Sequence, residues 1–248
     1  MEAGELALYL FFACTLVTIL QHPSSPVRQL IVSALLRRFL MGLAMGTLVI
    51  AIVLTPWGKQ SGGHFNPAIT LAYYRLGKLE AWDVLFYTAA QFAGAISGTA
   101  IARYVLGGAL RNEAVRYAVT EPGRFGSAVA FLAELAISFI LMITILFATN
   151  RENLARYTPY FVGLLVAVYY TFESPLSGMS TNPARSFGSA VHADYWRALW
   201  VYFTAPLLGM LLAADVFLRA RGGVGPCCAK LHHDNNKRCI FNHGYRPS

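Results

Sequence analysis

The sequence has few charged residues. Asp, Glu, Lys and Arg together make up only 13% of its 248 residues, whereas hydrophobic residues account for 56% and the mean hydropathy is +0.49. Soluble globular domains carry roughly 25% charged residues. The composition therefore excludes an ordinary soluble domain and predicts a protein whose solvent is the lipid bilayer.

Acidic residues are the scarcer kind of charge, 12 against 20 basic residues, which leaves a formal net charge of +8. A basic excess can indicate nucleic-acid binding. Here, however, the lysines and arginines are scattered between the apolar stretches and over the C-terminal end, and they do not line one helical face. The sequence thus predicts no nucleic-acid partner, and loops beside a membrane explain the basic residues more simply.

Cysteine is also sparse, and its spacing gives no disulfide framework. Cys14 lies within an apolar stretch, while Cys227, Cys228 and Cys239 lie near the C-terminal end. The chain further lacks a nucleophile with an orienting base, a phosphate-cradling loop and paired carboxylates in a cleft. These absences predict that the protein is not an enzyme.

What the chain has is long apolar stretches, each approaching the roughly 20 residues that cross a bilayer as a helix. They are residues 4–21, 39–55, 81–102, 125–149, 157–172 and 198–214. The first stretch begins without the basic leader and small-residue cleavage site of a secretory signal, so we expect it to remain as a permanent span. The predicted fold is an all-α membrane protein with six transmembrane helices.

Two short segments interrupt the apolar pattern in the same way. Residues 61–68 read Ser-Gly-Gly-His-Phe-Asn-Pro-Ala, and residues 177–184 read Ser-Gly-Met-Ser-Thr-Asn-Pro-Ala. The runs that follow, 69–74 and 185–191, are too short to cross a bilayer but long enough for two helical turns. With three spans in each half, the second half lies upside down relative to the first. We therefore expect an inverted 3+3 repeat whose two re-entrant half-helices meet near the bilayer midplane.

The repeat also sets the expected domain boundaries. A transmembrane channel domain covers residues 1–222, with halves of about 1–122 and 123–222. A basic tail rich in Cys and His, residues 223–248, follows it. The point at which the two halves meet is the natural position of a pore.

Both interruptions place Asn-Pro-Ala at a helix start: Asn66, Pro67 and Ala68 in the first half, and Asn182, Pro183 and Ala184 in the second. Asn caps free backbone amides, and Pro suits the first helical position. The two Asn side chains keep N–H donors that can point into the pore, where a water oxygen accepts from both. The positive ends of both half-helices point at the same spot, so cations are repelled there.

The approaches to the two motifs are rich in small residues, so we expect non-helical backbone whose carbonyls line the pore. The candidate carbonyls belong to Gly62, Gly63, His64, Gly178 and Ser180. Each half also has a glutamate inside an apolar span, Glu5 and Glu134, and burial of a charge is costly without partners. We expect both carboxylates to hold the motif loops through backbone amides.

Two further side chains near the motifs have specific interpretations. Arg185 follows the second motif directly, and a fixed guanidinium at a narrow opening donates hydrogen bonds and opposes cations. The first half has Ile69 in the equivalent place, so the predicted filter is one-sided. His64 could gate the pore by titrating near neutral pH, but a packed loop histidine bonded to the backbone is the favoured interpretation.

The doubled Asn-Pro-Ala, its two flanking strings and the span glutamates resemble the aquaporin (major intrinsic protein) family over about residues 4–220. One such motif could cap any helix, whereas two with matching approaches in a six-span chain are highly specific. The resemblance implies a homotetramer with one pore per subunit and cytoplasmic termini. It also implies a filter of four positions near the outer mouth, which matching strings place on Met41, Tyr170, Met179 and Arg185.

By this resemblance the function is passive diffusion of water in single file, with protons and ions excluded. Ser186 and Ala190 after the second motif look like the water-channel subgroup. Water-selective members usually have Phe and His where this chain has Met41 and Tyr170. An alternative therefore stays open, in which the channel passes small neutral solutes such as glycerol or ammonia.

The tail carries soft metal ligands: Cys227, Cys228, His232, His233, Cys239 and His243. They could hold zinc, copper or iron, although their spacing matches no zinc template. A disordered basic tail near anionic lipid is the favoured interpretation, so no cofactor is expected. A second alternative is a metal-responsive membrane protein with a vestigial pore. Short loops and the lack of a leader favour the inner (plasma) membrane of a bacterium.

Overall fold

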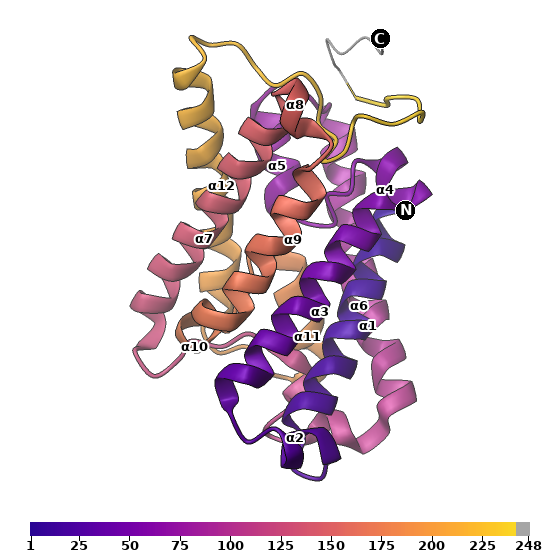
Figure 1. Ribbon diagram of the computed structural model, residues 1–248, viewed down its shortest axis with the longest axis vertical. Coiled ribbons are helices and arrows are strands. Elements are labelled where there is room, and N and C mark those ends of the chain that lie inside the picture. Colours follow the sequence, from indigo (N-terminus) through magenta and orange to yellow (C-terminus); the bar gives the residue numbers. More distant parts are fainter. Residues whose placement is uncertain (242–248) are drawn as a thin grey trace.

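The structure, a computed structural model, describes residues 1–241, and every regular element in that part of the chain is helical (Figure 1). Long apolar helices form the body of the molecule. Those long and apolar enough to cross a membrane are α1 (Glu2–Gln21), α3 (Ala34–Leu54), α6 (Ala81–Leu106), α7 (Gly126–Thr149) and α12 (Leu199–Ala220). They correspond to five of the six predicted spans and confirm an all-helical membrane fold.

The remaining predicted span, residues 157–172, is helical but divided. It forms α9 (Thr158–Val168), a π-helical turn over Tyr169–Glu173 and α10 (Ser174–Ser177). Pro175 has no backbone N–H, so it cannot donate to the Thr171 carbonyl one turn earlier. The Arg38 Nε donates to that carbonyl instead, at 3.1 Å. A proline therefore interrupts the regular ladder at the end of this span.

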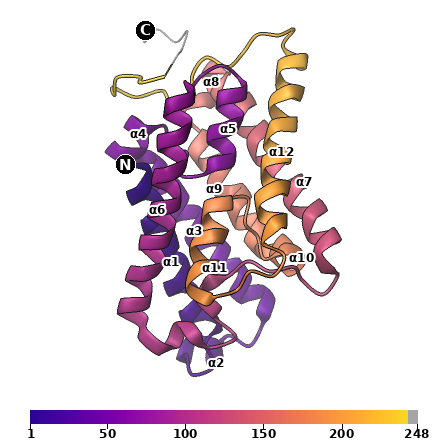
Figure 2. The same cartoon turned by 180° about the vertical axis from the view of Figure 1, so that it is seen from behind.

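The two predicted half-helices are present as α5 (Pro67–Arg75) and α11 (Pro183–Ala193). Both begin at the proline of their motif and run a little longer than the apolar runs suggested. Short helices connect the larger elements: α2 (Pro26–Leu30), α4 (Pro56–Ser61), η1 (Gly107–Arg111), η2 (Arg116–Ala118) and α8 (Glu152–Ala155). Seen from behind, α5 lies toward one end of the bundle and α11 toward the other (Figure 2).

The N-terminus and the tail residues 222–241 lie at the same end of the molecule, beside α4, α5 and α8 (Figure 1). We call this end the termini side and the opposite end, which carries α2 and α10, the far side. The chain thus starts and finishes its helical part on one face of the membrane domain.

Close helix contacts depend on glycine. A Cβ placed on Gly94 or Gly98 of α6 would come within 2.2 or 2.3 Å of the Ala3 or Ala7 carbonyl oxygen of α1. Small residues spaced by four allow helix backbones to approach closely. The pair therefore packs α6 against α1 within one subunit.

Gly98→Ala is expected to destabilise the protein by about 1–3 kcal/mol, because the added methyl group forces α1 and α6 apart. Gly108→Ala is a matched control, since a Cβ there has nothing within 4 Å. Thermal unfolding of the two variants in detergent measures the difference. Equal unfolding temperatures would show that this contact does not limit helix packing.

Candidate pore

Each Asn-Pro-Ala motif caps its half-helix as the sequence predicts. Asn66 Oδ1 accepts a hydrogen bond from the Ala68 amide at 2.9 Å. Asn182 Oδ1 accepts from the amides of Ala184 at 3.1 Å and Arg185 at 3.2 Å. Because the side-chain oxygens are used for capping, the amide nitrogens point away from the helices and toward the opposite motif.

The two motifs are joined crosswise by these nitrogens. Asn66 Nδ2 donates to the Thr181 carbonyl at 2.8 Å, and Asn182 Nδ2 donates to the Phe65 carbonyl at 2.7 Å. An amide nitrogen carries two hydrogens, so one hydrogen of each Asn is left for a permeating molecule. The prediction of N–H donors at the motifs is compatible with this geometry, although one hydrogen of each Asn holds the two halves of the chain together.

Glu134 holds the second motif loop through backbone amides, in the geometry that we expected. Its two carboxylate oxygens accept from the Ser180 amide at 2.6 Å and the Thr181 amide at 2.7 Å. Oε1 also accepts from the Ser177 hydroxyl at 2.7 Å, and that hydroxyl oxygen accepts from the Met179 amide. One buried carboxylate therefore fixes the whole turn before Asn182.

The first half divides this task between two glutamates, and the prediction for Glu5 is corrected here. Glu2 accepts from the amides of His64 at 3.1 Å and Phe65 at 2.7 Å. Glu5 instead accepts from the Ser61 hydroxyl at 2.9 Å. Glu2 precedes Glu5 by three residues, so both lie on one helix face. That spacing was the signal that could have identified Glu2 from the sequence.

Matched tyrosines complete the supports of the two loops. Tyr87 donates its hydroxyl hydrogen to the Ser61 carbonyl, and Tyr202 donates to the Ser177 carbonyl, both at 2.6 Å. The following glycines, Gly62 and Gly178, have φ values of 102° and 81°, which favour glycine. The inverted repeat therefore extends to the individual hydrogen bonds around each motif.

The predicted pore carbonyls are not all open in this structure. The carbonyl of Gly62 accepts a hydrogen bond from the Leu231 amide of the tail at 3.0 Å. His64 is packed as favoured, with Nδ1 3.1 Å from the Thr70 hydroxyl and Nε2 2.7 Å from the Ala229 carbonyl. The tail thus contacts the first motif loop directly, which the sequence did not indicate.

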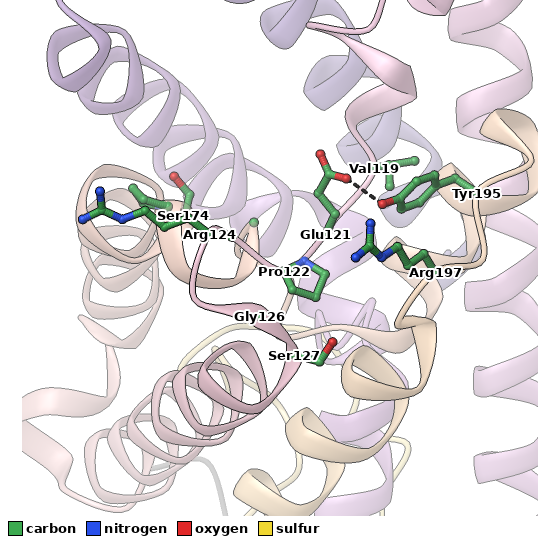
Figure 3. A pocket seen from close by; sticks show the side chains of 12 residues that line it. Val119, Glu121, Pro122, Arg124, Gly126, Ser127, Ser174, Tyr195 and Arg197 are labelled. Atoms are coloured by element: carbon green, nitrogen blue, oxygen red, sulfur yellow. Dashed lines mark hydrogen bonds between the residues drawn. The ribbon is translucent and has the colours of Figure 1, made fainter.

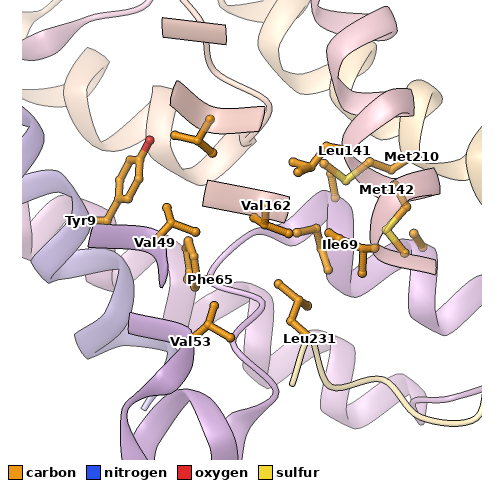
Figure 4. Packing of buried hydrophobic residues seen from close by; sticks show 14 of the residues in the cluster. Tyr9, Val49, Val53, Phe65, Ile69, Leu141, Met142, Val162, Met210 and Leu231 are labelled. Carbon is orange, nitrogen blue, oxygen red and sulfur yellow. The ribbon is translucent and has the colours of Figure 1, made fainter. Parts of the chain in front are cut away.

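A central cavity of about 40 Å³ lies where the motifs meet. Its lining includes Asn66 and Asn182, together with Tyr9, Met179 and Leu231. Figure 4 shows Leu231, on the yellow tail segment, pointing into the same cluster of buried apolar side chains as Tyr9. Met179 lines this cavity, beside the motifs. Tyr9 was missed in the sequence, although it follows Glu5 by four residues and shares its helix face.

A second cavity, of about 190 Å³, opens toward the far side. Its lining brings together three of the four predicted filter residues, Met41, Tyr170 and Arg185. Arg185 is 3% exposed, and its Nη1 donates to the Ala118 carbonyl at 2.7 Å. The guanidinium is therefore held in one position at the inner end of this cavity.

The Tyr9 and Tyr170 hydroxyls mark the boundary between the two cavities. Tyr9 lines the central cavity and Tyr170 the far-side cavity, with their hydroxyl oxygens 3.2 Å apart. A hydrogen-bonded pair of aromatic side chains narrows the path between them. Together with Arg185, it forms the candidate constriction.

The far-side cavity adjoins a wider surface cavity of about 720 Å³, with which it shares Val119, Glu121, Ser174 and Gly178. Figure 3 shows Tyr195 donating its hydroxyl hydrogen to Glu121, a 2.7 Å bond. Arg116 also pairs with Glu121, at 2.9 Å. Loops thus form a broad polar entrance to the narrow part of the path.

The candidate metal ligands of the tail do not gather in the part of the chain that the structure describes. Within residues 1–241, no three His, Cys, Asp or Glu side chains come together as a metal site would require. His243 lies outside the described residues. Two of the candidate ligands, Cys228 and Cys239, have sulfurs 3.5 Å apart.

Comparison with known protein families gives a match to the major intrinsic protein (MIP) family over residues 3–217. This chain belongs to the major intrinsic protein family. The resemblance seen in the sequence is thereby confirmed, and the chain is an integral membrane protein of a channel family. In this MIP protein, the paired half-helices and the buried glutamates shape the candidate pore.

Relatives of this MIP protein differ in their names. Aquaporin NIP2-3 from Zea mays is 34% identical over 186 residues, which are 75% of this chain and 60% of that protein. Glycerol uptake facilitator protein-like 6 from Lactiplantibacillus plantarum is 36% identical over 177 residues, 70% of this chain and 81% of that protein. The chain thus spans less than two thirds of the maize relative's length.

Two further similarities extend this range. Aquaporin Z from Photorhabdus laumondii is 28% identical over 186 residues, 71% of this chain and 80% of that protein. The X-ray structure of the aquaglyceroporin from Plasmodium falciparum superimposes with a TM-score of 0.73 at 21% identity, covering 87% of this chain and 92% of that one. The latter confirms the aquaporin fold.

Proposed function

We propose that this MIP protein is a passive channel for water that excludes protons and ions. The observation that carries the proposal is the pair of half-helix caps, Asn66 and Asn182, which face one small cavity from opposite halves. Each keeps one N–H hydrogen that can donate to a water oxygen. Two fixed donors orient that water so that its own hydrogens point away from the centre.

The size of the central cavity supports water as the permeant. Its volume of about 40 Å³ fits one or two water molecules, since a water occupies about 30 Å³ in the liquid. Glycerol, with three carbons and three oxygens, is several times larger than one water. With the tail in place, the space between the motifs therefore has room for water but not for glycerol.

Exclusion of cations has two sources along the proposed path. The N-termini of α5 and α11 both point at the centre, each with a partial positive charge of about half a unit. Arg185 adds a full positive charge at the constriction, where water is scarce and charges interact strongly. A cation would meet both barriers without a carboxylate in the lining of the central cavity to compensate.

A second candidate function is passage of small neutral solutes such as glycerol or ammonia. Met41 and Tyr170 line the far-side cavity, and neither is the filter residue usual in water-selective members. A relative from Lactiplantibacillus plantarum is named glycerol uptake facilitator protein-like 6. Tyr9 favours water as the permeant, because its hydroxyl contact with Tyr170 narrows the entrance to the central cavity.

Osmotic shrinkage of proteoliposomes separates these functions. With sorbitol as impermeant osmolyte, we expect the protein to speed water efflux well above that of empty vesicles, while glycerol entry stays slow. Fast entry of glycerol as well would establish the broader solute channel. The channel proposal would be overturned if neither the unchanged protein nor any variant described below released water faster than empty vesicles.

The assembly and the membrane setting are part of the same proposal. We propose a homotetramer with one pore per subunit, in the inner (plasma) membrane of a bacterium and with the termini side facing the cytoplasm. We propose further that the channel domain, residues 1–222, needs no cofactor. Cross-linking in the membrane tests the tetramer, and elemental analysis of the purified protein tests the absence of metal.

A further inference from the structure

The tail does not leave the molecule after α12 but returns to the pore. Residues 225–241, which we call the tail hairpin, run across the termini side past α8 and toward α4 (Figures 1 and 2). Cys227 and Asn150 form an anchor, in which the Cys227 amide donates to the Asn150 Oδ1 at 2.7 Å. The hairpin is therefore attached to the loop between α7 and α8 before it reaches the pore.

Leu231 is the part of the tail hairpin that enters the path. Its side chain is 1% exposed and lines the central cavity with Asn66 and Asn182. Its amide donates to the Gly62 carbonyl at 3.0 Å. That carbonyl is one of the acceptors expected to guide water, so the tail occupies a position where a permeating molecule would bind.

Residues on both sides of Leu231 strengthen this contact. The Ala229 carbonyl lies 2.7 Å from His64 Nε2. The Phe241 ring stacks on the His64 ring, with centroids 5.7 Å apart and planes 6° from parallel. The imidazole of the first motif loop is thus covered by the tail on its edge and on one face.

The tail hairpin also has its own internal brace. Lys230 is 1% exposed, and its Nζ donates to the carbonyls of Lys237 at 3.3 Å and Arg238 at 3.2 Å. Gln60 of α4 donates to the same Arg238 carbonyl at 3.1 Å. A buried ammonium group needs such acceptors. The two arms are therefore held together in a defined shape, as a plug requires.

We propose that the tail hairpin is an autoinhibitory plug that closes the pore from the termini side, and that Cys228 and Cys239 form its redox latch. The proposal rests on the proposed channel function and adds its regulation. The plug is held by backbone hydrogen bonds and apolar contacts, so it can leave as a unit. Departure of the tail frees the Gly62 carbonyl and opens the central cavity toward the termini side.

The latch follows from the position of the two sulfurs in opposite arms. They lie 3.5 Å apart, and a disulfide requires about 2.05 Å. Cys228 is buried whereas Cys239 is partly exposed, so attack on an external disulfide begins at Cys239. The Cys239 thiolate displaces one thiolate from a disulfide such as oxidised glutathione, and Cys228 then displaces the second. The products are the Cys228–Cys239 disulfide and two reduced glutathione molecules.

A closed latch favours the plugged state. The cross-link restricts the conformations that the tail can adopt when it is away from the pore, whereas the docked hairpin already has its two arms together. Oxidation is therefore expected to lower water permeability several-fold, and reduction to restore it. The covalent change is fully reversible by thiol exchange.

The first test removes the side chain that enters the path. Full-length Leu231→Ser is expected to conduct water several-fold faster than the unchanged protein, in the shrinkage assay under reducing conditions. Ile240→Ser is the matched control, because Ile240 lies on the same hairpin but is 47% exposed. Equal rates for the unchanged protein and Leu231→Ser, with both above empty vesicles, would overturn the plug and leave the channel function standing.

The second test addresses the latch. Treatment with oxidised glutathione is expected to slow water efflux through the unchanged protein but not through Cys228→Ser or Cys239→Ser, with Cys227→Ser responding like the unchanged protein. EDTA is present throughout, so that metal held by tail residues cannot produce the change. Mass spectrometry confirms the Cys228–Cys239 link. Faster efflux after oxidation, or an unchanged response in Cys228→Ser, would overturn the latch.

Discussion

Glu134→Gln is expected to abolish most of the water permeability and to lower the yield of folded protein. The carboxylate accepts two backbone amides and one hydroxyl in the second motif loop. A glutamine keeps one acceptor oxygen and turns a donor NH₂ group toward one of the two amides, those of Ser180 and Thr181. Each buried amide left without an acceptor costs about 1–3 kcal/mol, so the turn before Asn182 loses its defined shape.

A matched control for this variant is Glu173→Gln. Glu173 is also buried on the second half, but within residues 1–241 its carboxylate accepts no hydrogen bond from a backbone amide. Its replacement by a neutral group should leave permeability and folding near those of the unchanged protein. Detergent size-exclusion profiles measure folding, and vesicle shrinkage measures permeability. An equal loss of water permeability in Glu173→Gln and Glu134→Gln would contradict this prediction. It would show that a buried carboxylate is needed on this half whether or not it accepts backbone amides.

Arg185→Ala is the second large change, and it acts on selectivity instead of folding. The guanidinium is held at the inner end of the far-side cavity by the Ala118 carbonyl. Without it, a permanent positive charge and several donors are lost from the constriction. We expect proton or small-cation leakage to rise by about tenfold or more, equivalent to roughly 1.4 kcal/mol, while water flow is retained.

Arg38→Ala is the comparison for Arg185→Ala, because Arg38 lines the same cavity but bonds to the Thr171 carbonyl instead of the Ala118 carbonyl. A pH-sensitive dye inside the vesicles reports proton entry, and glycerol uptake is followed in parallel. Leakage that rises equally in both variants would mean that the cavity's total charge, and not a guanidinium at the narrowest point, excludes cations. Unchanged selectivity in Arg185→Ala would remove it from the filter.

Much of the fold could be predicted because helical spans and caps are local properties of the sequence. Long apolar runs place α1, α3, α6, α7 and α12, and Asn-Pro-Ala places the starts of the half-helices. The division of the remaining span at its π-helical turn depends on Pro175 and on Arg38, a residue far away in the chain. A pattern read along residues 157–172 does not show the contact with Arg38.

Details of the site were harder to predict for the same reason. Glu5 and Glu134 look equivalent in the sequence, but Glu2 reaches the amides of the first loop and Glu5 does not. The three-residue spacing places Glu2 and Glu5 on one helix face, but which of them meets the amides depends on the packing of α1 against the loop. The position of the tail was the hardest feature to predict from the sequence. Its composition suggests metal ligands or disorder, whereas Leu231 makes long-range contacts with the first motif loop and the central cavity.

The crosswise bonds between the motifs have a consequence for how the protein is made. While the ribosome has produced only the first half, the Asn66 Nδ2 and the Phe65 carbonyl lack their crosswise partners, because Thr181 and Asn182 do not yet exist. The first re-entrant loop must therefore wait in the membrane with an unpaired donor and acceptor until the second half inserts. Folding of each half is completed only when the crosswise bonds to the other half form. Neither half alone should therefore yield a stable product in the cell.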